Sequence, residues 1–210
     1  MKIAILFSGR INDNLEQYEN IMKNLVMNND VDFFISYPIN TNKDIIQNVV
    51  NLYNPKKIIE NDEIYFNINK YEKKYETIAH NVMCMYLSRK KLNDAFKTYV
   101  EENNINYDIV IATRIDLIFE KNIELNELIE NIEKNELCIP NPKKDWGGIN
   151  DQFAIGNFYT VTEYLNVYNS LFELLESGII LHPETLLLEY LNRIKIKVVR
   201  FELEYKIERY

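Results

Sequence analysis

Three apolar runs of strand length alternate with stretches of helical periodicity in the first part of the chain. The runs cover residues 3–7, 31–37 and 57–59 and are rich in Ile and Phe. Between them, over residues 15–26 and 44–53, apolar residues recur at the spacing of one helix face. Because each such helix would connect two parallel strands, this order predicts a doubly wound parallel sheet.

The rest of the chain continues this alternation without a repeat or linker. After a loop at 61–72, one long helix or two joined helices are predicted over residues 75–102. The β-branched run 108–111 is typical of an inner parallel strand. The pattern predicts a single α/β, Rossmann-like domain with a mostly parallel central sheet flanked by helices. Further predicted elements are a helix at 125–132, strands at 136–139 and 153–156, a helix at 161–177 ending at Gly178, a helix at 185–192 after Pro183, and a half-exposed or edge strand at 195–204.

Composition narrows the class of protein. A length of 210 residues with 47% hydrophobic and 27% charged residues suits one globular domain, and the net charge of −8 argues against a nucleic-acid partner. No apolar stretch approaches the roughly 18 residues of a membrane span, and no secretion signal is evident, so we expect a soluble, cytoplasmic protein. Cys84 and Cys138 lack a Cys or His at ligand spacing, which predicts reduced, buried thiols rather than a zinc site or disulfide.

An Arg-x-Asp sequence follows the predicted central strand. Arg114 and Asp116 stand near the carboxyl end of that strand, where ligands bind in open α/β sheets. Charged groups are costly to bury unless they are paired or bind a ligand. Two interpretations remain open: the two residues belong to a ligand site, or they pair with each other or cap a turn.

The turn after the first strand, Ser8-Gly9-Arg10, is a second candidate. Gly9 permits close approach of the backbone, Ser8 offers a hydroxyl, and Arg10 could face a phosphate, but an ordinary turn with a solvated Arg explains the sequence as well. The turn lacks both the Gly-Lys-Ser/Thr ending of a P-loop and the dinucleotide fingerprint. Arg89 and His80, on the long predicted helix, are further candidate ligand contacts, although a lone His on such a helix is more often structural.

A glycine pair marks the other informative stretch. Trp146, the only tryptophan, precedes Gly147 and Gly148, and Asp151 and Gln152 lead into a predicted strand. Paired glycines allow unusual backbone angles or close approach of a ligand, and an aromatic ring near carboxylates and amides is a usual sugar platform. The alternative is a glycine turn before a strand, with Asp151 as its cap.

These motifs together resemble the GT-A glycosyltransferases. The resemblance rests on the first strand with its small-residue and Arg loop, the Arg-x-Asp, the segment Gly-Gly-x-Asn-Asp-Gln, and a later His-Pro-Glu. More narrowly, the chain is similar to small sugar transferases of large DNA viruses and to bacterial surface-polysaccharide enzymes. The resemblance implies one GT-A domain, in which residues 1–120 mainly bind the nucleotide and residues 121–210 mainly bind the donor sugar and the acceptor.

The same resemblance implies an activity and a location. A sugar would move from a nucleotide-diphosphate sugar to a hydroxyl of a glycan or glycoprotein acceptor. A viral member of this group would act in the viral factory of its host cell, and other members in the cytoplasm.

A metal site is implied only in part. Such enzymes typically hold a divalent cation on the diphosphate with Asp-x-Asp, and here Arg114 replaces the first acid. Asp116 would bind Mn²⁺ or Mg²⁺ together with the diphosphate, and His182 would add a nitrogen ligand that Mn²⁺ tolerates better. Alternatively, Arg114 itself neutralises the diphosphate, because guanidinium matches phosphate oxygens. Either device stabilises the negative charge that grows as the bond from sugar to phosphate breaks.

The remaining roles concern the sugar and the acceptor. Asp151 is the expected general base if the enzyme inverts the anomeric centre, and it positions the sugar if the enzyme retains it. Two other classes stay open, a nucleotidyltransferase and a non-catalytic nucleotide-sugar-binding domain that lost the first metal acid. The full set of expected donor contacts is Ser8, Gly9, Arg10, Arg89, Arg114, Asp116, Trp146, Gly147, Gly148, Gln152 and Glu184, of which Glu184 would also bind acceptor hydroxyls.

Overall fold

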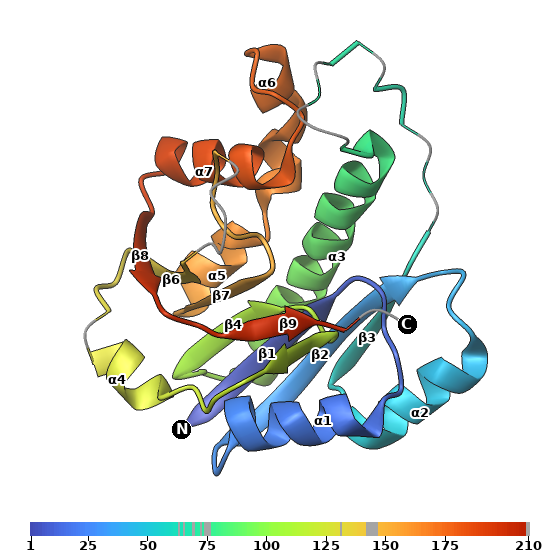
Figure 1. The fold of residues 1–210 in the computed structure, drawn as a ribbon, viewed down its shortest axis with the longest axis vertical. Coiled ribbons are helices and arrows are strands. Elements are labelled where there is room, and N and C mark those ends of the chain that lie inside the picture. The colour runs from blue at the N-terminus through green and yellow to red at the C-terminus, as the bar shows by residue number, and fades with distance from the viewer. Residues whose placement is uncertain are drawn as a thin grey trace.

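The computed structural model describes residues 1–62, 64, 66–68, 70–71, 73, 77–130, 132–141 and 147–208. A seven-stranded sheet crosses its centre, with helices on both faces (Figure 1). In chain order the elements are β1 (Lys2–Ser8), α1 (Leu15–Ile21) continued by a π-helical turn (Met22–Val26), β2 (Asp30–Pro38), α2 (Lys43–Tyr53), β3 (Lys57–Asn61), α3 (Ala79–Asn103), β4 (Ile109–Thr113), β5 (Leu117–Phe119), α4 (Leu125–Glu130), β6 (Glu136–Pro140), β7 (Phe153–Gly156), α5 (Phe158–Tyr164), a 3₁₀ turn (Val167–Ser170), α6 (Leu171–Glu176), α7 (Pro183–Arg193), β8 (Lys197–Phe201) and β9 (Tyr205–Ile207).

The sheet has the strand order β3-β2-β1-β4-β7-β6-β8. β1 pairs in parallel with β2 and β4, β2 with β3, and β6 with β8, whereas β7 is antiparallel to both of its neighbours. The predicted α/β architecture with a mostly parallel central sheet is therefore confirmed. The sequence did not predict β5 and β9, which form a second, two-stranded antiparallel sheet.

Alternate residues of the inner strands feed two hydrophobic cores. Along β1, Ala4 and Leu6 face the core under α3, α5 and α7, while Ile3, Ile5 and Phe7 face the core under α1, α2 and β5. All five side chains are buried, as the continuous apolar run predicts for a strand covered on both faces.

Two apolar residues within the helices predicted at 15–26 and 75–102 are exposed, although the prediction places them on the buried helix faces. Leu15 is 55% exposed, and the buried face of α1 is occupied instead by Gln17 and Ile21. Residues four apart share a helix face, so Leu15, two positions before Gln17, points the opposite way. Ile78 is 64% exposed because it precedes the first residue of α3 and lies outside the helical face.

The helix predicted over residues 161–177 is divided into α5, a 3₁₀ turn and α6. α5 begins earlier than predicted, because the Asn157 side chain accepts a hydrogen bond from the Thr160 amide and caps the helix. The chain leaves α5 near Asn166, and residues of this type disfavour helix interiors. The predicted end at Gly178 fits its positive φ of 89°.

Cys138 is buried, as predicted, whereas Cys84 is only partly buried. Cys84 is partly exposed, and its Sγ lies 3.4 Å from Nε2 of His80 one helical turn earlier. The expectation that no His stands at ligand spacing from a cysteine is therefore wrong, since residues four apart on a helix are neighbours.

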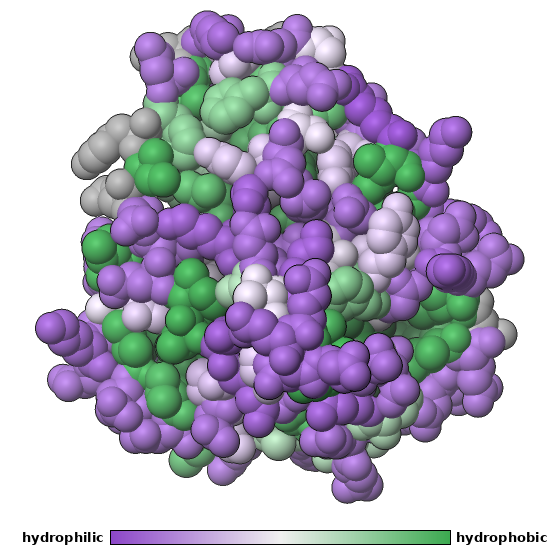
Figure 2. Space-filling model, turned by 180° about the vertical axis from the view of Figure 1, so that it is seen from behind, coloured by the Kyte–Doolittle hydropathy of each residue, from purple (hydrophilic) through white to green (hydrophobic). Residues whose placement is uncertain are grey.

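One face of the molecule is mainly polar. The face opposite to that of Figure 1 is largely hydrophilic, with separate apolar areas between the charged side chains (Figure 2). Among the described residues, no helix combines the length and apolar character needed to span a bilayer.

Candidate functional site

The chain order of the sheet reverses at β1. This strand lies between β2 and β4, so the connections that follow β1 and precede β4 run on opposite sides of it. A reversal of this kind leaves a crevice at the carboxyl ends of the strands, where open α/β proteins bind ligands. The β1–β4 register ends with Phe7 opposite Thr113, so Ser8 and Arg114 are the next residues along the two strands.

Arg114 and Asp116 form a bidentate ion pair. Nε of Arg114 lies 2.7 Å from Oδ1 of Asp116, and Nη2 donates to Oδ2. Burial acts to lower the pKa of Arg114, but the hydrogen bonds and negative charge of Asp116 outweigh it, and the pKa is raised. Asp116 is 7% exposed, whereas about a third of the Arg114 side chain is exposed. The interpretation in which the two residues pair with each other is therefore correct, and the Arg114 side chain remains partly exposed.

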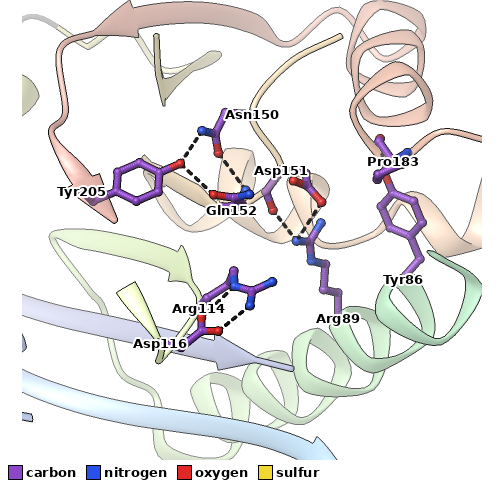
Figure 3. A network of polar contacts seen from close by, with 9 residues as sticks. All are labelled: Tyr86, Arg89, Arg114, Asp116, Asn150, Asp151, Gln152, Pro183 and Tyr205. Atoms are coloured by element: carbon purple, nitrogen blue, oxygen red, sulfur yellow. Dashed lines mark hydrogen bonds and ion pairs between the residues drawn. The ribbon is translucent and has the colours of Figure 1, made fainter. Parts of the chain in front are cut away.

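Arg89 holds Asp151 at the other side of this region (Figure 3). The guanidinium projects from α3, donates to the main-chain oxygen of Asp151, and lies 3.7 Å from its carboxylate Oδ2. The Asp151 charge also contributes to the raised pKa of Arg114, so Arg89, Asp151, Arg114 and Asp116 form one electrostatic cluster.

Tyr205 connects the C-terminal strand to the same loop. Its hydroxyl accepts a hydrogen bond from Asn150 Nδ2 at 2.6 Å and donates one to Gln152 Oε1 at 2.9 Å. Asn150 Oδ1 in turn accepts from the Gln152 amide. Burial, followed by the charges of Asp151 and Glu184, raises the pKa of Tyr205 above its ordinary value, against the opposing effect of the Asn150 hydrogen bond.

The start of α7 packs directly on the glycine turn. A Cβ on Gly148 would lie 2.2 Å from the carbonyl carbon of Glu184, and the Ile149 amide donates to the Glu184 oxygen. The close approach at Gly148 is therefore to the protein's own backbone. Gly147 has a positive φ of 78°, which fits the alternative of a glycine turn before a strand.

His182, Thr185 and Gly147 are linked at the same place. Nδ1 of His182 lies 3.0 Å from the Thr185 hydroxyl, which donates to the main-chain oxygen of Gly147. Nearby, the Tyr86 hydroxyl donates to the Pro183 oxygen, so α3 supports the start of α7 (Figure 3).

The turn after β1 shows the features of an ordinary strand end. Gly9 has a φ of 119° and donates its amide to the Ser36 oxygen, and Ser8 continues the β1–β2 register opposite Ser36. Arg10 is exposed. Trp146, expected in the sugar pocket, lies outside the described residues.

A divalent cation at Asp116 has a specific requirement. Both carboxylate oxygens accept hydrogen bonds from Arg114, so this donor set fits a cation only when that pair opens. Within the described chain, no group of three or more His, Cys, Asp or Glu side chains could hold a metal ion.

The structure brings Arg89, Asp151, Arg114 and Asp116 together from α3, the loop before β7 and the segment after β4. Gly147, Gly148, His182 and Glu184 meet at the start of α7. Tyr205, Asn150 and Tyr86 were missed. Tyr86 was assigned to the apolar face of its helix, and nothing in the local sequence of Tyr205 or Asn150 indicates that they meet.

Comparison with protein-family models and with curated proteins finds no match to this chain. The site must therefore be interpreted from its own chemistry.

Proposed function

We propose that this protein is a glycosyltransferase that transfers a sugar from a nucleotide-diphosphate sugar to a hydroxyl of a glycan or glycoprotein. The observation that carries the proposal is the cluster of Arg114, Asp116 and Asp151 at the carboxyl end of β4. It combines an accessible fixed cation with a nearby carboxylate, which are the two groups that sugar transfer from a diphosphate requires. The GT-A fold and the cytoplasmic location are both part of this proposal. The sequence motifs and the position of the site beside the sheet reversal support the assignment to the GT-A fold.

The partly exposed side chain of Arg114 is the proposed phosphate contact. Asp116 holds Nε and Nη2 of this partly exposed side chain, and Nη1 is the proposed donor to the phosphate. As the sugar–phosphate bond breaks, negative charge grows on the leaving diphosphate. A cation already fixed in position stabilises that charge without reorganisation at the moment of reaction.

A divalent cation, Mn²⁺ or Mg²⁺, is the alternative source of positive charge in this proposal, because it would bind Asp116 only when the Arg114–Asp116 pair opens. Asp116 and His182 are the residues that would hold it, with diphosphate oxygens and water as further ligands. Bound there, it would supply positive charge to the leaving diphosphate.

Asp151 is the proposed base for the acceptor hydroxyl. Nη2 of Arg89 lies 3.7 Å from the Asp151 carboxylate, and the charges of Asp151 and Glu184 both act on Tyr205 of β9. Gln152 and Glu184 are the proposed contacts to hydroxyls of the sugar or acceptor, because amides and carboxylates are suited to such groups.

One observation favours a second candidate, a non-catalytic nucleotide-sugar-binding domain. Both oxygens of Asp116 are occupied by Arg114, an arrangement that is complete without a cation. Such a domain would bind the donor and release no sugar from it.

A thermal-shift panel of nucleotide sugars and nucleoside diphosphates, with and without Mn²⁺, tests the proposal. The proteins are the wild type, Asp116→Ala, and the control Asp94→Ala, which removes an exposed i,i+4 pair with Lys90 on α3. A ligand at a hundredfold excess over Kd stabilises the folded state by about 2.7 kcal/mol. We expect one donor to shift the wild type and the control but not Asp116→Ala.

Turnover then separates the two candidates. Release of nucleoside diphosphate with transfer to an added sugar supports the transferase, and binding without release supports the non-catalytic domain. A wild type that no nucleotide or nucleotide sugar shifts would contradict both.

A further inference from the structure

Arg89 is enclosed so completely that a ligand has little access to it. It is 4% exposed, and its guanidinium carbon lies 5.7 Å from the ring centre of Tyr86 and 5.6 Å from that of Tyr164. Rings at these distances stabilise a guanidinium by cation–π interaction. Arg114, by contrast, has about a third of its side chain exposed.

The polar contacts of Arg89 are concentrated on one residue. Nη2 donates to the main-chain oxygen of Asp151 and also lies 3.7 Å from its carboxylate. Nη1 is buried with no hydrogen-bond partner among the described residues. A buried cation is costly unless it is paired, so Asp151 is the group that compensates Arg89.

Two contacts to one residue constrain more than a single ion pair does. The main-chain contact fixes the loop backbone at residue 151, and the carboxylate contact restricts the orientation of the Asp151 side chain. On the other side of this loop, Tyr205 bonds to the flanking residues Asn150 and Gln152. The loop is therefore held from α3 on one side and from β9 on the other (Figure 3).

We infer that Arg89 is a positioning residue, which holds the Asp151 carboxylate in place and does not contact the donor. This inference rests on the proposed function in that Asp151 is the reacting carboxylate. It replaces the expectation that Arg89 binds the nucleotide sugar. Preset geometry of this kind raises the rate of the chemical step without tightening donor binding.

The test compares variants on two neighbouring turns of α3. Arg89→Met removes the charge and the donors at similar length. Arg89→Lys retains a charge that can reach Asp151. The matched control is Asn93→Leu, which removes a buried hydrogen bond of 2.9 Å from α3 to the Thr162 oxygen and leaves the loop untouched.

Hydrogen exchange of the peptide covering residues 147–153 is the first readout, because it needs no ligand. We expect exchange in Arg89→Met to accelerate by about tenfold or more, since losing a charge-assisted hydrogen bond shifts a local opening equilibrium by that order. Arg89→Lys should restore part of the protection. Asn93→Leu should leave this peptide unchanged. Unchanged exchange in Arg89→Met would overturn the inference.

Kinetics with the nucleotide sugar that gives the largest thermal shift are the second readout. We expect Arg89→Met to lower kcat by about tenfold or more while KM and the donor Kd stay within about twofold. Asp151→Asn keeps the main-chain oxygen but loses the carboxylate charge, so it should lose turnover and keep more of the slow exchange than Arg89→Met does. A weakened donor Kd with unchanged kcat in Arg89→Met would show a donor contact and contradict the inference. If the wild type has no turnover, the proposed function fails, whereas the exchange data still decide whether Arg89 holds the loop.

Discussion

Arg114 donates hydrogen bonds to both carboxylate oxygens of Asp116, two positions further along the chain, with Nε 2.7 Å from Oδ1. The geometry joins a nearly buried carboxylate to a cation that remains partly accessible. Asp116 thereby fixes the orientation of the guanidinium near the carboxyl end of β4. The pair has a structural role, and the same arrangement makes Arg114 available to an anion.

Removing the cation of this pair should destabilise the protein. We expect Arg114→Met to lower the free energy of unfolding by about 1.5–3 kcal/mol, because a hydrogen-bonded charge in Asp116 loses its partner. In the double variant Arg114→Met/Asp116→Asn, part of that loss should be recovered, since the uncompensated charge is gone. Urea denaturation of the wild type, Arg114→Met, Asp116→Asn and the double variant measures the coupling energy of the pair. Strictly additive losses would contradict the pair, and donor binding should not return in the double variant.

Gly148 should not tolerate a side chain. In Gly148→Ala the new Cβ would meet backbone atoms of Glu184 at 2.2–2.4 Å, so the turn or the start of α7 must shift. We expect a loss of about 1–3 kcal/mol or more in the free energy of unfolding, together with loss of donor binding. Gly178→Ala is the control, because a Cβ there meets open space at a φ of 89° and costs about 1–2 kcal/mol of strain. Donor binding that survives in Gly148→Ala would show that this contact does not shape the site.

The hydroxyl of Tyr205 should matter more than its ring. Tyr205→Phe leaves Asn150 Nδ2 and Gln152 Oε1 without their shared partner, and we expect it to cost about 1–3 kcal/mol. Tyr159→Phe, at a residue that is half exposed, should leave stability within about 0.5 kcal/mol. Chemical denaturation compares the two. Equal stabilities of both variants and the wild type would exclude a connecting role for the Tyr205 hydroxyl.

Stability should decline in alkaline solution. Burial raises the pKa of Tyr86 and Tyr164 above the ordinary value of 10.0, so both stay protonated in the folded state. The unfolded chain releases these protons first, and the free energy of unfolding is fully retained below about pH 10 and falls as pH rises beyond it. Unfolding temperatures across this range, with tyrosinate absorbance, measure the effect.

Tyr164→Phe isolates one tyrosine in that response. Its hydroxyl is buried with no partner among the described residues, so its removal should cost little at neutral pH and should reduce the alkaline loss. An alkaline loss as steep as that of the wild type would contradict the assignment of this group.

Local sequence patterns predicted the elements of the fold but not all of their faces. The runs around Ile5 and Ile111 are apolar throughout and could only be covered on both sides, which is the condition of inner parallel strands. Leu15 and Gln17 could not be assigned in this way, because the buried face of a short helix depends on where it starts and how it lies on the sheet. The small β5–β9 sheet was missed since its strands are three residues each and far apart in the chain.

The candidate site was likewise only partly predictable from local sequence patterns. The sequence by itself determined that Arg114, Asp116, Asp151 and Gln152 follow or precede strands, because strand ends are visible as local changes from apolar to polar residues. Only the tertiary structure decided that Arg89 holds Asp151, that Tyr205 connects Asn150 to Gln152, and that Gly148 meets Glu184. These contacts join residues far apart in sequence, and their geometry depends on how α3, α7 and β9 pack rather than on any local pattern.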